Sequence, residues 1–360
     1  MRIAVVGASG FVGGHVLRTL RRQGEDVRAV VRNPRFSPDD PDRRIADALD
    51  VYALRDALEG CDCVVHAVLG QQDVILGSLP PVYAAAQAVG VRRIVYISTG
   101  VVHGQSPAPG TDETSPIHAR HEFAYNNAKV RAERKLLGLR RRGTVEVVML
   151  RPTIVFGPRS RWVDGFAQTL QNRTAYTVDR AQGICNTIYI DNLVHAVRLA
   201  LTAHGVDGEA FLVGDEETVT WRDLCRPLAS AAGFDFDTLP DFNPPDPRPG
   251  LNQLYLEPIR TSELAQAVLP RVPHLVKAGI KLPYRVARRL ARLSRPPSQP
   301  NVAAPRGIEV TTEMIQLHRC QWKLPHDKAR RLLGYKAPVT FAEGCRRCAD
   351  YIRSAEVAIA

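Results

Sequence analysis

Three glycines after an apolar segment at the N-terminus constrain the fold of this 360-residue chain more than any other feature. The segment RIAVVG predicts a buried strand, and FVGGHVLRTLRRQG predicts a helix that ends at Gly24. Gly7, Gly10 and Gly13 join the two in the spacing GxxGxxG. Glycine permits a tight turn here and lets a pyrophosphate approach the helix N-terminus. The pattern therefore predicts a dinucleotide-binding turn, and a turn that merely requires glycine is the simpler alternative.

Strands and helices alternate through the first part of the chain, which indicates an α/β fold with a parallel sheet covered on both faces. Further strands are predicted in DVRAVVR, CDCVVHAV, RRIVYIS and VEVVMLRP. We therefore expect a Rossmann-type doubly wound sheet in residues 1–155, joined by a return segment at about 185–205. Residues 156–184 and 206–360 are expected to form a smaller, mixed α/β substrate-binding domain.

The composition is ordinary for a globular protein, with 45% hydrophobic and 24% charged residues. The chain has neither a run of eighteen apolar residues nor a signal-peptide pattern, so we expect a cytoplasmic protein. Its seven cysteines are then expected to be reduced thiols. Cys345 and Cys348 form a CxxC, which we interpret as two thiols on one helix face. No metal site is predicted, because no ligand set has suitable spacing.

The net charge is +11, and much of the surplus falls in a late segment with no acidic residue between Glu263 and Glu309. There, PYRVARRLARLSR places apolar side chains at helical spacing and arginines on the other faces. We interpret this segment as an ordinary cap helix with a solvated face. Basic amphipathic helices of this kind also occur at membrane surfaces, so peripheral membrane contact through residues 276–295 is the alternative. No nucleic-acid partner is expected, because no aromatic residues accompany the arginines.

The residue after the second strand distinguishes the two nicotinamide dinucleotides. An acidic residue there would bond the ribose hydroxyls of NAD, whereas an arginine suits the 2′-phosphate of NADP. Arg32 stands nineteen residues after Gly13. We therefore predict a preference for NADP, with NAD as the alternative because an exposed arginine can also stack on adenine. Asp47 and Ala48 follow the third strand, near the expected position of the adenine.

A buried strand that ends in two hydroxyl residues, Ser98 and Thr99, indicates where the chemistry takes place. Tyr125 and Lys129 follow in YNNAK, and residues at i and i+4 share one helix face. A lysine beside a phenol lowers the pKa of the phenol, because positive charge favours phenolate. Tyr125 is therefore predicted to exchange a proton with an alcohol or ketone, whose oxygen a hydroxyl holds. An unremarkable surface helix is the alternative.

Together these motifs resemble the extended short-chain dehydrogenase/reductase family, also called the NAD-dependent epimerase/dehydratase family. The resemblance includes GASGFVG, STGVVHG, YNNAK, LRPTIVFGP, IYIDNL and the tail DKARRLLGYKAPVTFAEG. It implies an NAD(P)-dependent oxidoreductase for a small-molecule substrate, with Thr99 as the catalytic hydroxyl and Lys129 also holding the nicotinamide ribose. A homodimer formed through a helix pair would be typical of the family. The residues expected at the cofactor are Gly7, Ser9, Gly10, Phe11, Val12, Gly13, Arg32, Asp47, Ala48, Ala67, Tyr125, Lys129 and Pro152.

Departures from the family patterns narrow the expected reaction. Dehydratases of the family follow the threonine with Asp-Glu, and Gly100 and Val101 stand there instead, so water elimination is not expected. Nucleotide-sugar members carry polar residues at two positions that are Ile154 and Ile184 here. Asn192, in YIDN, resembles the hydroxysteroid-dehydrogenase branch.

We therefore predict reversible oxidation or reduction of a secondary alcohol or ketone in a lipid-like, steroid-like or natural-product substrate. A nucleotide-sugar epimerase or ketoreductase is the alternative, in which Arg159 or Arg161 would replace the missing diphosphate contacts. A protein that senses NADP without catalysis is a third possibility. The candidate substrate contacts are Ser98, Ile154, Arg159 and Arg161.

Overall fold

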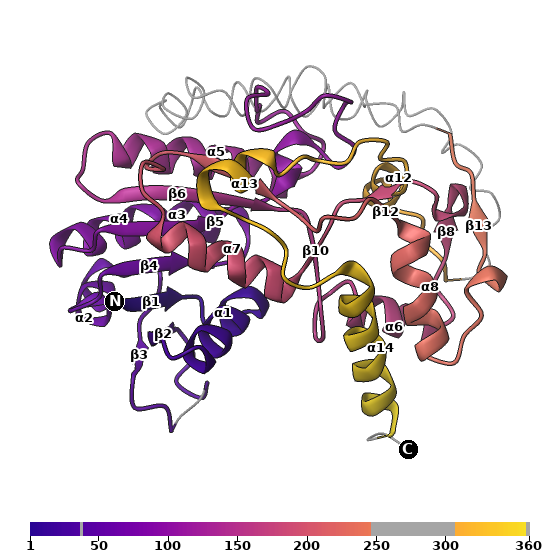
Figure 1. The fold of residues 1–360 in the computed structure, drawn as a ribbon, viewed down its shortest axis with the longest axis horizontal. Coiled ribbons are helices and arrows are strands. Elements are labelled where there is room, and N and C mark those ends of the chain that lie inside the picture. The colour runs from indigo at the N-terminus through magenta and orange to yellow at the C-terminus, as the bar shows by residue number, and fades with distance from the viewer. Residues whose placement is uncertain (37–38, 246–306, 358–360) are drawn as a thin grey trace, which may run out of the picture.

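A computed structural model describes residues 1–36, 39–245 and 307–357. Its centre is a seven-stranded parallel sheet in the order β11-β6-β5-β4-β1-β2-β3 (Figure 1). This order confirms the predicted α/β class and the Rossmann-type doubly wound sheet. The strands are β1 (Arg2–Val6), β2 (Asp26–Val31), β3 (Arg43–Ile45), β4 (Cys63–His66), β5 (Arg93–Ile97), β6 (Glu146–Pro152) and β11 (Ala210–Val213).

Helices cover both faces of this sheet and enclose two separate hydrophobic cores. Successive side chains of β1 alternate between them: Val5 packs in the core of α1 and α7, whereas Ala4 and Val6 pack in the other core. Strands buried on both faces are continuously apolar, which is why RIAVV and RIVYI lack an alternating pattern. One face carries α1 (Phe11–Arg22) and α7 (Ile190–Thr202), and the other carries α2 (Val51–Leu58), α3 (Gln72–Gly77), α4 (Leu79–Ala88) and α5 (Ala124–Arg140).

The remaining elements gather beside the carboxyl ends of the strands, on the right in Figure 1. They contain three small two-stranded sheets, β10-β7, β12-β9 and β13-β8. Their strands are β7 (Ile154–Phe156), β8 (Thr177–Val178), β9 (Ile184–Cys185), β10 (Thr187–Tyr189), β12 (Val219–Thr220) and β13 (Asp241–Phe242). The helices are α6 (Asp164–Gln171), α8 (Trp221–Ala231), α12 (Thr312–His318) and α14 (Phe341–Val357), with 3-10 turns η1 (Gly100–His103), η2 (Asp179–Ala181) and η3 (Phe236–Thr238). A further helix, α13 (Asp327–Leu333), lies instead over the main sheet beside β11.

The predicted end of the return segment near residue 205 is wrong. β11 pairs in parallel with β6 at the edge of the main sheet, so the segment that returns to the sheet extends to residue 213. Lys328 of α13 covers this strand and donates to the carbonyl oxygen of Ala210 at 2.9 Å. The segment GEAFLVG has the apolar pattern of a strand, but strand pairing between distant segments does not follow from local periodicity.

Two further predictions have different outcomes. The basic amphipathic helix and residues 276–295 lie outside the described residues. Within the described part of the chain, no helix has the length and apolar character needed to span a bilayer. Cys345 and Cys348 are buried in α14, as the interpretation of CRRC as a helical segment requires. Burial raises the pKa of both thiols.

Candidate active site

The glycine-rich turn connects β1 to α1 at the point where the strand order reverses between β1 and β4. Gly7 has a φ of +90°, and a Cβ there would lie 2.9 Å from the carbonyl carbon of Ala67. A Cβ on Gly13 would lie 2.3 Å from the carbonyl oxygen of Gly7, so both positions require glycine. Gly10 begins α1 without a side-chain cap, which leaves the first N–H groups of the helix available to an anion. This cradle fits the pyrophosphate of a dinucleotide.

The other predicted cofactor residues lie along the same edge of the sheet, because parallel strands end on one side. Ala67 follows β4 directly, and its N–H donates to the carbonyl oxygen of Val6 at 2.9 Å. Asp47 follows β3 and accepts a hydrogen bond from the N–H of Leu49 at 3.0 Å. The remaining members are Ser9, Phe11 and Val12 in the glycine turn and first helical turn, Arg32 after β2, Ala48 after β3, and Pro152 at the end of β6.

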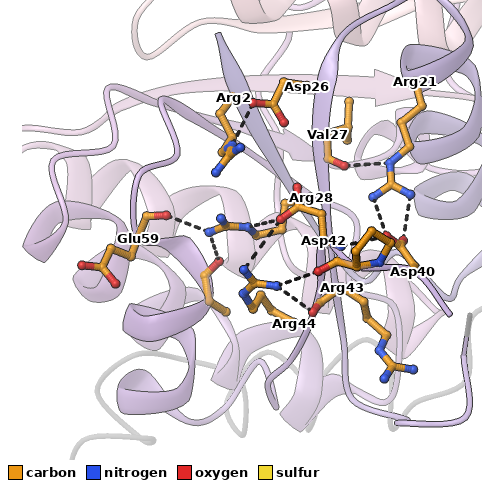
Figure 2. Close-up of polar contacts among 12 residues, drawn as sticks. Arg2, Arg21, Asp26, Val27, Arg28, Asp40, Asp42, Arg43, Arg44 and Glu59 are labelled. Carbon is orange, nitrogen blue, oxygen red and sulfur yellow. Dashed lines mark hydrogen bonds and ion pairs between the residues drawn. The ribbon is translucent and has the colours of Figure 1, made fainter. Parts of the chain in front are cut away.

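Figure 2 shows arginine side chains that fix the loop between β2 and β3. Arg21 of α1 donates to both carboxylate oxygens of Asp40, at 2.7 and 3.2 Å. Arg28 of β2 donates to Asp42 at 3.1 Å. Arg43 of β3 donates to two carbonyl oxygens of the loop, at 2.6 and 3.1 Å. Asp40 is therefore already paired with Arg21 of α1, and Asp42 with Arg28 of the sheet.

Arg32 differs from these arginines, because it is exposed directly after β2. Neither Arg32 nor Arg35 forms a side-chain hydrogen bond or ion pair with any residue that the structure describes. Two guanidinium groups are thus available at the position where the adenosine ribose is expected.

Thr99 and Tyr125 meet at the end of β5. The hydroxyl of Thr99 caps η1, where it accepts a hydrogen bond from the N–H of Val101 at 3.3 Å. Tyr125 lies in the first turn of α5, is 39% exposed, and is close enough to Thr99 for that side chain to lower the pKa of the phenol. The structure therefore brings together the predicted hydroxyl and the predicted acid/base.

The prediction that Lys129 lowers the pKa of Tyr125 is wrong for this structure. The Lys129 Nζ atom donates to the Tyr96 hydroxyl at 3.2 Å and to the carbonyl oxygen of Ile97 at 2.8 Å. Although 39% of Tyr125 is exposed, desolvation of its phenol raises the pKa to about 12, and the Thr99 side chain acts in the opposite direction. Burial also lowers the pKa of Lys129 to about 8.

Ser98 belongs to a buried polar network rather than to a substrate surface. Its hydroxyl donates to Glu133 Oε1 at 2.5 Å. Arg151 donates to both carboxylate oxygens of Glu133, at 3.0 and 2.7 Å, and its Nη1 lies 3.2 Å from His103 Nε2. Ser98, Glu133 and Arg151 are all buried, so the predicted role of Ser98 as a substrate contact is not supported.

The two isoleucines that replace polar residues line one small cavity of about 20 Å³ next to η1. Ile154 and Ile184, from β7 and β9, share it with apolar side chains that include Leu317 and Leu324. The Oγ1 atom of Thr153 is buried with no hydrogen-bond partner among the described residues. Apolar side chains predominate in the wall of this cavity, which a few polar side chains also line.

Gly100 contributes to the same wall, and its environment explains why the position is glycine. A Cβ there would lie 2.8 Å from Thr153 Cγ2 and 3.3 Å from Leu324 Cδ1. An aspartate would require these neighbours to move. This agrees with the expectation that water elimination is not the reaction.

The structure separates the two candidate arginines after β7. The charge of Arg161 acts on Tyr125, and its guanidinium lies 3.9 Å from the carboxylate of Glu313. The charge of Arg159 acts instead on Arg18 of α1. Of the two arginines, only Arg161 therefore acts on the charge of Tyr125.

Sequence reasoning missed the buried partners of the site, of which Tyr96 and Glu133 contact predicted residues directly. A weak signal was present, because Glu133 lies two helical turns after Tyr125 and so shares a face of α5 with Lys129. No local pattern identifies Tyr96, which reads as one more apolar residue of β5.

A glycine cradle at the switch point, with Thr99, Tyr125 and Lys129 beyond the next strand, defines an NAD(P)-dependent oxidoreductase with a Rossmann fold. Residues 3–214 match the profile of the NAD dependent epimerase/dehydratase family, and the chain belongs to this family.

Two curated relatives and one solved structure illustrate the similarity. The 3 beta-hydroxysteroid dehydrogenase/Delta 5-->4-isomerase of Mycobacterium tuberculosis is 28% identical over 64% of this chain and 70% of its own length. The 4-hydroxy-2-methyl-3-oxo-4-farnesyl-3,4-dihydroquinoline-1-oxide ketoreductase of Stigmatella aurantiaca is 24% identical over 96% of this chain and 94% of its own. The dTDP-glucose 4,6-dehydratase DesIV of Streptomyces venezuelae, solved with NAD bound, shares the fold with a TM-score of 0.70, 18% identity, and coverage of 99% and 98% of the two chains.

Proposed function

We propose that this oxidoreductase prefers NADP and acts reversibly on a secondary alcohol or ketone of a lipid-like, steroid-like or natural-product substrate. The observation that carries the proposal is that Ile154 and Ile184, which stand where nucleotide-sugar members carry polar residues, line one mainly apolar cavity of about 20 Å³ next to η1. Apolar side chains there favour a hydrocarbon skeleton over a diphosphate, because burying an unpaired charge is costly. The steroid and farnesyl-quinoline names of the two curated relatives point in the same direction.

Each residue of the site has a defined part in the proposed reaction. The hydroxyl of Thr99 bonds the substrate oxygen and orients it toward Tyr125. The Tyr125 phenol gives its proton to the oxygen when a ketone is reduced, and takes it back when an alcohol is oxidised. Lys129 holds the nicotinamide ribose, and the first turn of α1 holds the pyrophosphate. The bound nicotinamide supplies or accepts the hydride.

The protonation of Tyr125 favours the reductive direction at neutral pH. Because burial raises its pKa to about 12, the phenol is protonated and ready to donate. Oxidation requires phenolate, which is scarce well below that pKa.

The activity test compares the wild-type protein with two variants in NADPH-dependent reduction of a 3-ketosteroid and of a long-chain 3-oxo ester. Tyr125→Phe should abolish turnover while leaving NADPH binding intact, because it removes only the phenolic hydroxyl and keeps the aromatic ring. Tyr52→Phe is the matched control, since Tyr52 is 79% exposed and is far from Tyr125 in the sequence. If the wild type binds NADPH but turns over neither ketone, the result would instead favour a protein that senses NADP without catalysis.

The preference for NADP is tested by fluorescence titration with NADPH and NADH. Arg32→Ala should weaken NADPH binding about 10-fold or more, because a charge-assisted hydrogen bond contributes about 1.5–3 kcal/mol. NADH binding should change little. Arg331→Ala is the control, because that arginine is exposed on α13. Tighter binding of NADH than of NADPH by the wild type would contradict the proposal.

A nucleotide-sugar epimerase or ketoreductase is the second candidate, and the exposed guanidinium of Arg161 near Tyr125 is the observation that favours it. Calorimetric titration with UDP and TDP separates the two candidates. Binding that Arg161→Ala removes would support the nucleotide-sugar reading, whereas no binding would support the apolar substrate.

A further inference from the structure

A second phenol lies behind Tyr125 and contacts Lys129 directly. β5 pairs with β4 so that Tyr96 stands opposite His66 in the sheet. The Tyr96 hydroxyl accepts a hydrogen bond from Lys129 Nζ at 3.2 Å, and Nζ lies 4.8 Å from the centre of the Tyr96 ring. Tyr96 is 1% exposed and Lys129 is 2% exposed. The ammonium is therefore cut off from bulk water and depends on protein groups for its hydrogen bonds.

The other groups that face this ammonium do not replace Tyr96. The carbonyl oxygen of Ile97 accepts one hydrogen bond at 2.8 Å. Glu133, one turn later on α5, attracts Lys129 but directs its carboxylate oxygens to Ser98 and Arg151.

On β4, the ring of His66 lies 5.4 Å from that of Tyr96. Burial and the charge of Lys129 lower the pKa of His66 to about 3, so it is neutral and adds no positive charge. His66 Nε2 lies 3.2 Å from the hydroxyl of Ser78. Among the residues that the structure describes, Tyr96 is thus the only side chain hydrogen-bonded to the Lys129 ammonium.

We propose that Tyr96 is a positioning residue for the reaction, which holds Lys129 in its charged form and fixes its Nζ atom beneath the site. The inference rests on the proposed function, because it assumes that the Lys129 ammonium holds the nicotinamide ribose. A buried ammonium without acceptors releases its proton readily, since desolvation disfavours the charged form. An acceptor supplied by the sheet opposes that release and restricts the long lysine side chain to one position.

The direct test is an NMR titration of Lys129 with protein labelled at lysine 13Cε. The chain has only seven lysines, so the signals can be assigned by substitution. In the wild type, Lys129 should titrate near its lowered pKa of about 8. Tyr96→Phe should lower this midpoint by about one unit, because it removes one hydrogen bond to a charged group. An unchanged midpoint would overturn the inference.

Tyr83→Phe is the matched control. Tyr83 lies in the same hydrophobic core as Tyr96, but its hydroxyl donates to the carbonyl oxygen of Val145 at 3.1 Å. It should leave the Lys129 midpoint unchanged while removing a comparable buried hydroxyl. An equal shift in both variants would assign the effect to general loosening and overturn the inference.

The pH profile of ketone reduction links the titration to the reaction. In Tyr96→Phe the alkaline limb of the profile should shift to lower pH by the same number of units as the NMR midpoint. In Tyr83→Phe its position should not change. A midpoint that moves while the wild type reduces no ketone would refute the proposed function and leave the contact between Tyr96 and Lys129 supported. A midpoint that moves without any change in the profile of an active enzyme would overturn the positioning role.

If Tyr96→Phe does not fold, the wild type still decides the question. With tyrosine labelled at 13Cζ, the signal of Tyr96 should shift with the Lys129 midpoint, because the two groups share a hydrogen bond. A Tyr96 signal that does not respond in that range would overturn the inference.

Discussion

Replacing Glu133 by glutamine should destabilise the protein strongly, because this carboxylate is the centre of the buried network beneath the strand end. It accepts three hydrogen bonds, at 2.5 Å from Ser98 and at 3.0 and 2.7 Å from Arg151. An amide keeps the shape but removes the charge and turns a donor toward one of these partners. Arg151 is then a buried cation without a counter-charge, which keeps the contact with His103 and at most a bond to the amide oxygen.

The size of the effect follows from the burial of both partners. Glu133 and Arg151 side chains are 1% and 6% exposed, so their ion pair is not screened by water. Removing one partner of such a pair costs about 3–5 kcal/mol. A domain is stable by about 5–15 kcal/mol in total, so the change removes a large part of it. With a urea m value of about 3–4 kcal/mol/M, the midpoint should fall by about 1 M.

Urea unfolding followed by far-UV circular dichroism measures this change directly. Asp26→Asn is the control, because Asp26 and its partner Arg2 are largely exposed and the midpoint should stay at the wild-type value. The double variant Glu133→Met/Arg151→Met should recover much of the loss, since it removes the uncompensated guanidinium. The reasoning is refuted if Glu133→Gln unfolds within about 1 kcal/mol of the wild type, or if the double variant is the less stable of the two.

Three further outcomes are expected. Gly13→Ala should weaken NADPH binding about 10-fold or more, because its Cβ would lie 2.3 Å from a backbone oxygen of the turn. Gly165→Ala, which has open space around it, should leave binding unchanged, and fluorescence titration measures both variants. Lys129→Met should raise the free energy of unfolding at pH 7 by up to about 3 kcal/mol, because burial lowers the lysine pKa from 10.5 to about 8. The unfolded state binds the extra proton between these values, so the wild type gains stability as pH rises through that window, and the difference from the variant disappears near pH 10.5 in urea titrations. Arg161→Ala should change the KM for substrate several-fold and Arg159→Ala should not, because only the charge of Arg161 acts on the Tyr125 phenol. Equal KM values for the two variants in steady-state kinetics would contradict this expectation.

Much of the fold follows from local patterns in the sequence. The apolar segment before Gly7 and the helix after Gly10 fix the first βα unit, because each signal depends only on neighbouring residues. Strand order is a different matter. β11 and β6 are separated by about sixty residues, and nothing within AFLV indicates that it joins the edge of the main sheet.

The candidate site divides in the same way. Thr99, Tyr125 and Lys129 are recognisable because a strand end and a helical spacing place them at one edge of the sheet. Their buried partners are not, because Glu133 and Arg151 become neighbours only when α5 packs on β6. Whether a buried charged residue is paired depends on the tertiary arrangement, which a single sequence does not contain.

The Tyr125–Lys129 spacing shows how far a helical pattern can be taken. It correctly puts both side chains on one face of α5, but it cannot say which acceptor receives the ammonium, because that acceptor comes from β5. In the structure, burial raises the pKa of the phenol and lowers that of the lysine. The phenol therefore keeps its proton and the lysine keeps most of its charge below pH 8, which is the combination that ketone reduction requires. The buried ammonium lowers stability in the same pH range, so Lys129→Met should gain stability under the conditions in which it loses turnover.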